Sequence, residues 1–267
     1  MSCACGHHHP KPVQSGAGAA ISLARPMIAL TGRLICHDTE QMMTALSLLP
    51  EHVRLSRAEP GCLRFDIWQD EDPMVWNLSE LFADADAFAA HQKRTAVTDW
   101  GEQSHSITRD FVKREISPVL REEQPSDIDG IDRVLREAFG GTDEARLVAG
   151  LRAQGDLQFS LVAEAGGAVI GHLGLSPLTG DVSALALAPV AVTPKLQRRG
   201  VGAAMIHHAL DRAGRTPVIV LGDPEYYGTF GFATVALNSP YAGPYLQAHG
   251  KIAPHSHIRH ADAFGQL

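Results

Sequence analysis

The sequence predicts an α+β protein of two domains, a ferredoxin-like domain followed by a domain built on a mixed sheet. Three observations lead to this prediction. The chain has 267 residues, enough for two ordinary domains. Segments with strand and helix periodicity follow the order β-α-β-β-α-β over residues 26–116. After residue 117 the order changes and includes a nearly continuous apolar strand, Val182–Val192, which is typical of burial on both faces.

The first 25 residues are rich in Gly, Ala, His and Pro and lack useful periodicity, so a flexible tail is expected over 1–25. Cys3, Cys5 and His7–His9 place soft and borderline metal donors close together. Either incidental metal affinity or solvated low-complexity sequence accounts for them. Because the spacing matches no recognised structural zinc pattern, we predict no metal site.

The ferredoxin-like domain is expected over 26–116, and each element has its own signal. Helix periodicity begins after the capping residues Asp38 and Asp84, and Asp72-Pro73 marks a turn between two strands. The expected elements are strand Met27–Cys36, helix Thr39–Arg57, a strand around Leu63–Ile67, strand Met74–Phe82, a helix from Asp84 to about Thr98 and strand Ser106–Arg114.

The second domain is expected over 117–267. Gly166-Gly167 is typical of a tight hairpin turn, and the apolar face of the helix after Gln197 repeats at helical spacing. The expected elements are strand Val119–Arg121, helices Ile128–Phe139 and Glu144–Gln154, strands Gln158–Glu164, Ala168–Leu175 and Val182–Val192, helix Gln197–Gly214 and strand Val218–Leu221.

Composition excludes several classes of function. The formal net charge of −7 argues against broad nucleic-acid binding, because neutralising phosphates requires surplus Lys and Arg. The longest apolar run, Val182–Val192, is too short to cross a bilayer. Cys36 and Cys62 lie far apart in expected strands, so no disulfide framework is indicated. We therefore expect a cytoplasmic protein that binds neither nucleic acid nor membrane.

The segment Gln197-Arg198-Arg199-Gly200-Val201-Gly202-Ala203 has the composition of a diphosphate-binding loop. Its glycines let successive backbone N–H groups turn toward one point, and the start of a helix adds unpaired donors and a positive dipole end. Arg198 and Arg199 supply positive charge. The competing interpretation is an ordinary tight turn between strand and helix.

Pro189 interrupts the apolar strand and cannot donate a ladder hydrogen bond. One interpretation is that the strand splays from its neighbour there and frees backbone groups for a ligand. The other is a simple bulge at a sheet edge.

Two motifs resemble those of the GNAT acetyltransferase family. The first, Leu187–Val192 with Pro194 and Gln197–Ala203, resembles the acyl-CoA-binding motif, and the second, Leu221–Phe232, resembles the family's later tyrosine-containing motif. The likeness spans roughly residues 119–264. It implies a mixed-sheet acyltransferase fold with acetyl-CoA as cosubstrate.

The same resemblance implies roles for individual residues. The backbone groups of Val190 and Val192 are expected to pair with the pantetheine arm of CoA. The residues expected to hold the diphosphate are Gln197, Arg198, Arg199, Gly200, Val201, Gly202 and Ala203. Tyr227 matches the tyrosine that donates a proton to the departing thiolate, with a core aromatic as the alternative.

The general base stays open at this stage. The apolar strand carries no carboxylate, and Asp181 before it and His172 on the preceding strand are the candidates. A water molecule relayed to a distant carboxylate would serve as well.

The segment Ser56–Asp66, with Asp72-Pro73, Glu80 and Ala83–His91, resembles the antibiotic biosynthesis monooxygenase domain family over about residues 26–116. This likeness implies a dimeric α+β barrel. His91 matches the family's histidine after the helix start, whereas Ala96 and Val97 occupy the region where some members have a further histidine. Quinol oxidation without a cofactor, dimerisation and ligand sensing all remain open for this domain.

Taken together, the sequence predicts an N-acetyltransferase that moves the acetyl group of acetyl-CoA to an amine of a small molecule. A homodimer formed through the N-terminal domain is expected. The alternatives are a non-catalytic acyl-CoA sensor, and a monooxygenase whose acetyltransferase domain has a secondary role.

Overall fold

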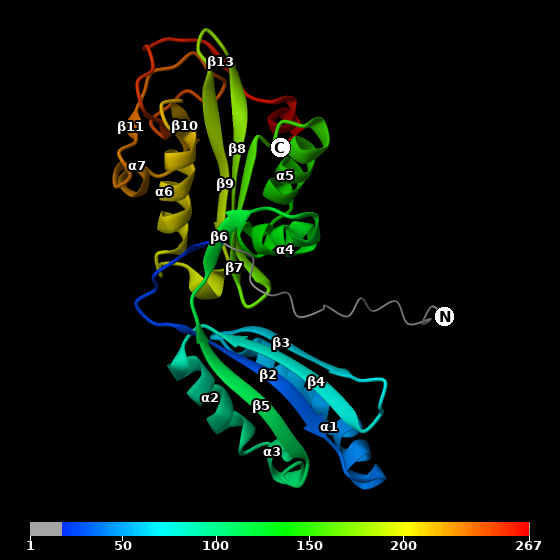
Figure 1. The fold of residues 1–267 in the computed structure, drawn as a ribbon. Coiled ribbons are helices and arrows are strands. Elements are labelled where there is room, and N and C mark those ends of the chain that lie inside the picture. The colour runs from blue at the N-terminus through cyan, green and yellow to red at the C-terminus, as the bar shows by residue number, and fades with distance from the viewer. Residues whose placement is uncertain (1–17, 267) are drawn as a thin grey trace.

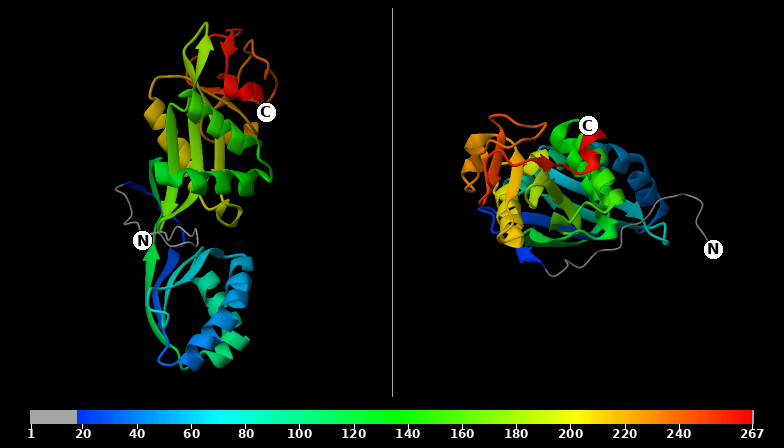
Figure 2. Two further views of the ribbon diagram at one scale, coloured as in Figure 1. Left: turned by 90° about the vertical axis from the view of Figure 1, so that its right-hand side faces the viewer. Right: turned by 90° about the horizontal axis from the view of Figure 1, so that it is seen from above.

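The computed structural model describes residues 18–266 and shows two units stacked along the long axis of the molecule (Figures 1 and 2). The N-terminal unit contains a four-stranded sheet, and the C-terminal unit contains the larger mixed sheet. The Cys3/Cys5/His7–His9 cluster lies outside the described residues. Within them, no helix is long and apolar enough to cross a membrane.

The N-terminal unit has the expected ferredoxin-like order of elements. Its antiparallel sheet runs β3-β4-β2-β5, and all three helices cover one face of it (Figure 1). The elements are β2 (Met27–Ile35), α1 (Thr39–Ala58), β3 (Cys62–Gln69), β4 (Val75–Phe82), α2 (Ala85–Thr95), α3 (Asp99–Gln103) and β5 (Thr108–Ile116). The side chains of Asp38 and Asp84 accept the capping hydrogen bonds of α1 and α2.

One element of this unit was not foreseen. The helix expected from Asp84 to Thr98 ends at Thr95, and Thr98 caps the separate short helix α3 by accepting from the Gly101 amide. A Cβ at Gly101 would lie 2.2 Å from the carbonyl oxygen of Thr95. The close turn between the two helices therefore requires a glycine. The sequence did not predict this turn, because the helical periodicity continues through it.

The C-terminal unit is a mixed sheet in the order β1-β6-β7-β8-β9-β10-β12-β11, with β13 paired to β8. Helices α4 and α5 cover one face and α6 covers the other (Figure 1). The elements are β6 (Val119–Glu122), α4 (Ile128–Phe139), α5 (Asp143–Gln154), β7 (Phe159–Ala165), β8 (Ala168–Gly180), β9 (Ala184–Val192), α6 (Val201–Ala213), β10 (Val218–Leu221), α7 (Pro224–Gly228), β11 (Ala233–Thr234), β12 (Leu246–His249) and β13 (Ile258–Arg259).

The segment expected as a tail differs in its last part. Strand β1 (Ala19–Ala20) pairs with β6 at Leu120 and Val119, and Ile21 is buried in the core of the C-terminal unit. Two paired residues are too short a strand to produce a periodic pattern in the sequence. The position of β1 depends on the unpaired backbone groups along β6, which form hydrogen bonds with a segment that pairs there.

The helix expected from Gln197 begins four residues later, at Val201. Gln197 is extended, and Arg198 and Gly200 adopt left-handed φ angles of 62° and 90°. A left-handed residue cannot continue a right-handed helix. Residues 197–200 are therefore a loop that leads into α6.

The two units share buried apolar side chains. Met27, Leu81 and Ala83 of the N-terminal unit belong to the same hydrophobic cluster as Leu196 and Val201, which lie around the start of α6. The contact between the units is consequently part of the core.

Candidate functional site

Strand β9 parts from β10 after its first residues. The two strands pair in parallel at Leu185 and Ala186, and within residues 18–266 no strand pairs with the rest of β9 on that side. On the opposite side, the register between β8 and β9 shifts around Ala188 and Pro189. Near Pro189 a bulge therefore faces β8 and a separation faces β10, and the bulge lies inside the sheet, not at its edge.

The separation leaves backbone groups of β9 facing open space. The Thr193 amide donates to the carbonyl oxygen of Ile170 at 2.9 Å, so Thr193 is a hydrogen-bonded position of the β8–β9 ladder. Hydrogen-bonding positions alternate along an antiparallel pair, so the backbone groups of Val190 and Val192 point away from β8. In agreement, the Gln197 side-chain amide donates to the Val192 carbonyl at 3.1 Å from the other side.

The loop after β9 presents a row of backbone donors. The chain passes through the short 3₁₀ helix η2 (Pro194–Leu196) and reaches α6, whose cap residue Gly200 makes no side-chain capping bond. Among the described residues, the amides from Arg198 to Ala203 donate to no protein oxygen. Unpaired amides at the positive end of a helix dipole form an anion-binding site.

The charged side chains of this loop divide into two groups. Arg198 is exposed beside the donor row. Lys195 and Arg199 instead contact the N-terminal unit: the Arg199 guanidinium pairs with Asp84 at 2.6 Å. The sequence-based expectation that Arg199 lends its charge to a diphosphate therefore differs from the structure, which leaves only its backbone amide facing the loop.

Tyr226 of α7 lies near the start of α6, and Tyr227 packs beside it. A Cβ built at Gly202 would lie 3.3 Å from the Tyr226 hydroxyl oxygen and 3.6 Å from Cγ2 of Val192, so a larger residue at 202 would crowd both. The Tyr227 ring packs edge-on against Tyr226 and Phe232 at centroid distances of 5.1 and 5.7 Å. Burial, and then the neighbouring Tyr226, raises the pKa of Tyr227 to about 12. Tyr227 therefore keeps its proton at neutral pH.

The two candidate bases lie in unfavourable places. His172 is fully buried, and its Nε2 lies 2.9 Å from the Ser160 hydroxyl and 3.9 Å from Glu123. Burial lowers the pKa of His172 to about 4. Side chains alternate along a strand and Gly171 faces α6, so His172 lies on the α4 face of the sheet, away from the loop's helix.

Asp181 lies at the far end of β9 from the loop. Its carboxylate accepts from the His257 amide at 2.7 Å, which ties the β8–β9 turn to the segment before β13. The geometry of neither residue favours a role as general base.

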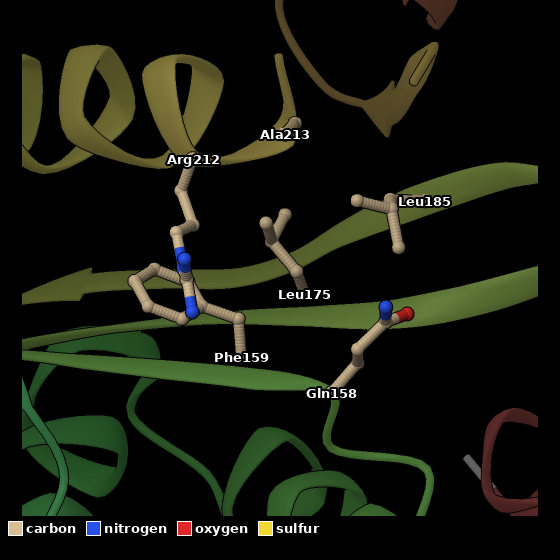
Figure 3. Close-up of a pocket in the computed structure, with 6 residues that line it drawn as sticks. All are labelled: Gln158, Phe159, Leu175, Leu185, Arg212 and Ala213. Carbon is tan, nitrogen blue, oxygen red and sulfur yellow. The ribbon is translucent and has the colours of Figure 1, made fainter. Parts of the chain in front are cut away.

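A small recess lies at the opposite end of α6 from the donor row (Figure 3). The Arg212 guanidinium lies over the Phe159 ring at 5.7 Å, and Gln158, Leu175, Leu185 and Ala213 complete the walls. Its volume of about 150 Å³ is below the roughly 300–1,000 Å³ of cofactor and ligand sites. We assign no cofactor to it.

A larger cavity of about 550 Å³ lies between the sheet and the helices of the N-terminal unit. His91 lines it and lies 3.0 Å from the Glu59 carboxylate. His52 of α1, which the sequence analysis did not identify, also lines the cavity, and its ring lies 5.7 Å from that of His91. Burial lowers the pKa of His52 to about 3 and raises the pKa of Glu80 to about 8. The walls thus carry neutral polar groups among aromatic side chains.

No metal centre is formed by the residues that the structure describes, since no three His, Cys, Asp or Glu side chains are grouped to hold an ion there.

Comparisons with known proteins agree with both units. The model of the acetyltransferase (GNAT) family matches residues 128–223, and the model named antibiotic biosynthesis monooxygenase matches residues 30–103.

Two curated relatives from Escherichia coli K12 match the chain. The uncharacterized N-acetyltransferase YhbS is 38% identical over 125 residues, which is 44% of this chain and 75% of YhbS. The uncharacterized N-acetyltransferase YjhQ is 35% identical over 130 residues, 45% of this chain and 72% of YjhQ. The crystal structure of Escherichia coli YhbS in complex with CoA matches at 30% identity and a TM-score of 0.51, covering 55% of this chain and 92% of YhbS.

Proposed function

Because the chain belongs to the GNAT acetyltransferase family, we propose that the donor row Arg198–Ala203 and the open edge of β9 bind acetyl-CoA for transfer of its acetyl group to an amine. The protein is an acetyl-CoA-dependent N-acetyltransferase. The observation that carries the assignment of the site is the run of six successive residues whose amides donate to no protein oxygen. A diphosphate supplies the acceptors that these donors lack.

Each proposed contact uses a group already described. Val190 and Val192 offer backbone groups on the free side of β9, where the pantetheine arm of the cosubstrate pairs as an added strand. Val201, Gly202 and Ala203 direct amides along the α6 axis toward the diphosphate, and Arg198 adds a positive charge. Gln197 holds the loop to β9 through the Val192 carbonyl.

Tyr227 is the proposed hydrogen-bond donor to the leaving group in the chemical step. The amine nitrogen bonds to the acetyl carbon, the carbon–sulfur bond breaks, and the sulfur leaves as a thiolate that takes up a proton from water. Tyr227 donates a hydrogen bond to the developing thiolate, since its raised pKa keeps the hydroxyl protonated. No side chain is assigned as base, so the amine proton leaves through water in this proposal.

We propose a primary amine of a small molecule as acceptor, although Leu221–Phe232 resembles a motif that lies outside the loops that set the acceptor in this family. A mass-spectrometric screen of amines incubated with acetyl-CoA and the protein identifies it. A wild type that binds acetyl-CoA but acetylates no small primary amine in the screen would contradict this choice of acceptor.

We also propose a homodimer through the N-terminal sheet. The helices cover only one of its faces, and Val112 of β5, 47% exposed, lies on the other, opposite Thr31. The resemblance of residues 26–116 to a domain family whose members dimerise through this sheet supports the proposal, and Val112 marks the face to be tested. Light scattering on the wild type and on Val112→Arg tests this: the variant is expected to shift toward monomer, and a monomeric wild type contradicts the proposal.

Calorimetric titration with acetyl-CoA tests the site. The wild type is expected to bind, and Gly202→Val is expected to weaken binding by about tenfold or more, because the side chain crowds Tyr226 and the donor row. Gly141→Val is the matched control, since a side chain at 141 meets open space. Absence of heat with the folded wild type would overturn the assignment.

A further inference from the structure

The proposed cofactor loop is fastened at both ends to the N-terminal unit. At one end, the Lys195 ammonium donates to the carbonyl oxygens of Arg57, Glu59 and Cys62 at 3.1, 3.0 and 2.8 Å. These carbonyls surround the C-terminus of α1, whose cap residue is Glu59. A positive charge is stabilised there by the negative end of the helix dipole.

At the other end, the Arg199 guanidinium makes two charge-assisted contacts. It donates to the Ala83 carbonyl at 2.9 Å and to the Asp84 carboxylate at 2.6 Å. The Asp84 carboxylate also accepts from the Ala87 amide as the cap of α2. Asp84 thus both caps α2 and binds Arg199 of the loop.

The environment of Asp84 favours its charged form. Asp84 is 5% exposed, and burial by itself would raise the pKa of its carboxyl. The hydrogen bonds from the Ala87 amide and Arg199 outweigh burial and hold that pKa below its usual value. The carboxylate is consequently ionised at neutral pH. It pairs with the Arg199 guanidinium, which would otherwise be free to reorient.

These contacts constrain residues 195–199, which lead into the donor row Arg198–Ala203 and form its first part. Between the two fastened cations lie Leu196, fully buried in the cluster shared by both units, and Gln197, whose side chain holds β9. Arg198, at the tip, is the residue held in the left-handed region. A ligand site needs its groups fixed to within a fraction of an ångström, which short loops achieve through supporting contacts.

On the premise of the proposed function of this loop, we propose that Asp84 is a positioning residue for acetyl transfer. The N-terminal unit holds the loop in its diphosphate-binding conformation through the Asp84–Arg199 pair and the carbonyls around Lys195. The acetyltransferase site is therefore completed by a domain that the monooxygenase model matches, since all of these partners lie within residues 30–103.

The test compares Asp84→Asn with Asp86→Asn in the full chain. Asparagine caps helices as well as aspartate, so the first variant keeps α2 and removes the charge that Arg199 needs. Asp86, two residues further on, is exposed and pairs with Arg25, so its variant makes the same change of charge away from the loop. Unfolding curves of both variants check that the fold is retained.

We expect Asp84→Asn to weaken acetyl-CoA binding about five- to twentyfold in calorimetry, and Asp86→Asn to change it less than about twofold. Arg199→Gln is expected to cause a similar loss, and the double variant to lose no more than either single one, because both residues act through one contact. Arg199→Lys, which keeps the charge, is expected to recover part of the affinity.

Two results would overturn the proposal while acetyl-CoA binding by the wild type stands. Unchanged affinity in Asp84→Asn would show that the loop needs no support. Tighter binding in that variant would show that Asp84 competes with the diphosphate for Arg199. A folded wild type that does not bind acetyl-CoA would instead overturn the proposed function.

Discussion

At the scale of the residue, the proposed role of Tyr227 requires that its hydroxyl stay protonated and yet stabilise a thiolate. Its pKa of about 12 lies above the roughly 8.5 of a thiol, so complete transfer of its proton to sulfur is unfavourable. A hydrogen bond that strengthens as the thiolate forms meets both conditions, because it stabilises charge present only in the transition state.

Tyr227→Phe is accordingly expected to lower kcat by about 10- to 100-fold and to leave the KM for acetyl-CoA nearly unchanged. Tyr226→Phe is the matched comparison, since its hydroxyl lies beside Gly202 and the donor row. That variant is expected to act on the KM for acetyl-CoA. Steady-state kinetics with varied acetyl-CoA separates the two, and an unchanged kcat in Tyr227→Phe would contradict its proposed stabilisation of the thiolate.

Arg198 combines a backbone strain with an electrostatic role. Its φ of 62° costs a side-chain-bearing residue roughly 1 kcal/mol, whereas glycine adopts this conformation freely. Arg198→Gly is therefore expected to leave the melting temperature equal or higher while weakening acetyl-CoA binding about threefold to tenfold. Thermal unfolding and calorimetry measure the two effects separately. A variant that binds as tightly as the wild type would show that the backbone amides suffice.

At the scale of the element, the sequence predicts what local chemistry determines. The hairpin between β7 and β8 turns at Gly166 and Gly167, both with positive φ, as their dipeptide indicates. The helices α1 and α2 begin after the expected capping aspartates because the cap is a contact over three residues. The buried character of β9 and the irregularity at Pro189 are likewise visible in the sequence.

What the sequence does not reveal depends on distant partners. Arg199 and Asp84 are separated by 115 positions, and neither residue carries a local signal of the other. The start of α6 at Val201 follows from left-handed residues whose conformation the helical periodicity does not encode. The placement of β1 depends on the free edge of β6. Hydrophobic periodicity predicts which face of an element is buried, but it does not predict which element covers that face.

His172 belongs to a polar network that joins two strands, a helix and Glu123, which follows β6. Arg152 of α5 makes two hydrogen bonds to Glu123, Ser160 of β7 donates to the same carboxylate, and His172 of β8 contacts Ser160. Burial, and to a smaller extent the charge of Arg152, lowers the pKa of His172 to about 4, although Glu123 acts in the opposite direction. The folded protein thus holds this ring neutral.

The network predicts a loss of stability in acid. Below pH of about 6.5 the unfolded chain protonates this histidine, whereas the folded state does not until about pH 4. The unfolded state then binds more protons, so the free energy of unfolding falls as pH falls through this window, by roughly 2–3 kcal/mol from this group.

His172→Gln is expected to be less stable than the wild type at pH 7 but to lose less stability between pH 6.5 and pH 4. Denaturant unfolding at several pH values measures the difference. His105→Gln is the control, since His105 is exposed. An identical pH dependence in wild type and His172→Gln would contradict the assigned burial of a neutral ring.

At the scale of the whole molecule, we expect the two units to unfold cooperatively, because they share one hydrophobic cluster. Leu81 of β4 is fully buried there, and a Cβ at Gly166 of the β7–β8 turn would lie 3.8 Å from its Cδ1. Unfolding of one unit exposes apolar surface of the other, which costs free energy. Ligand binding to the C-terminal unit should therefore stabilise the N-terminal unit.

The three tryptophans make this measurable. Trp68, Trp76 and Trp100 all lie in the N-terminal unit, so tryptophan fluorescence reports on that unit alone. Acetyl-CoA at about 100 times its Kd contributes about 2.7 kcal/mol, which raises the melting temperature of a protein of this size by roughly 5–10 °C. We expect the tryptophan transition to shift by this amount, although the proposed ligand site lies in the other unit.

Leu81→Ala tests whether the shared cluster carries the coupling. Loss of a buried leucine side chain destabilises by about 2–5 kcal/mol, and here it also removes contact between the units. The shift of the tryptophan transition by acetyl-CoA is expected to shrink in the variant, while calorimetric binding at 25 °C persists. If saturating acetyl-CoA does not shift the tryptophan transition of the wild type, the two units fold independently. The effect of Asp84 on the cofactor loop would then be limited to the contacts at the interface.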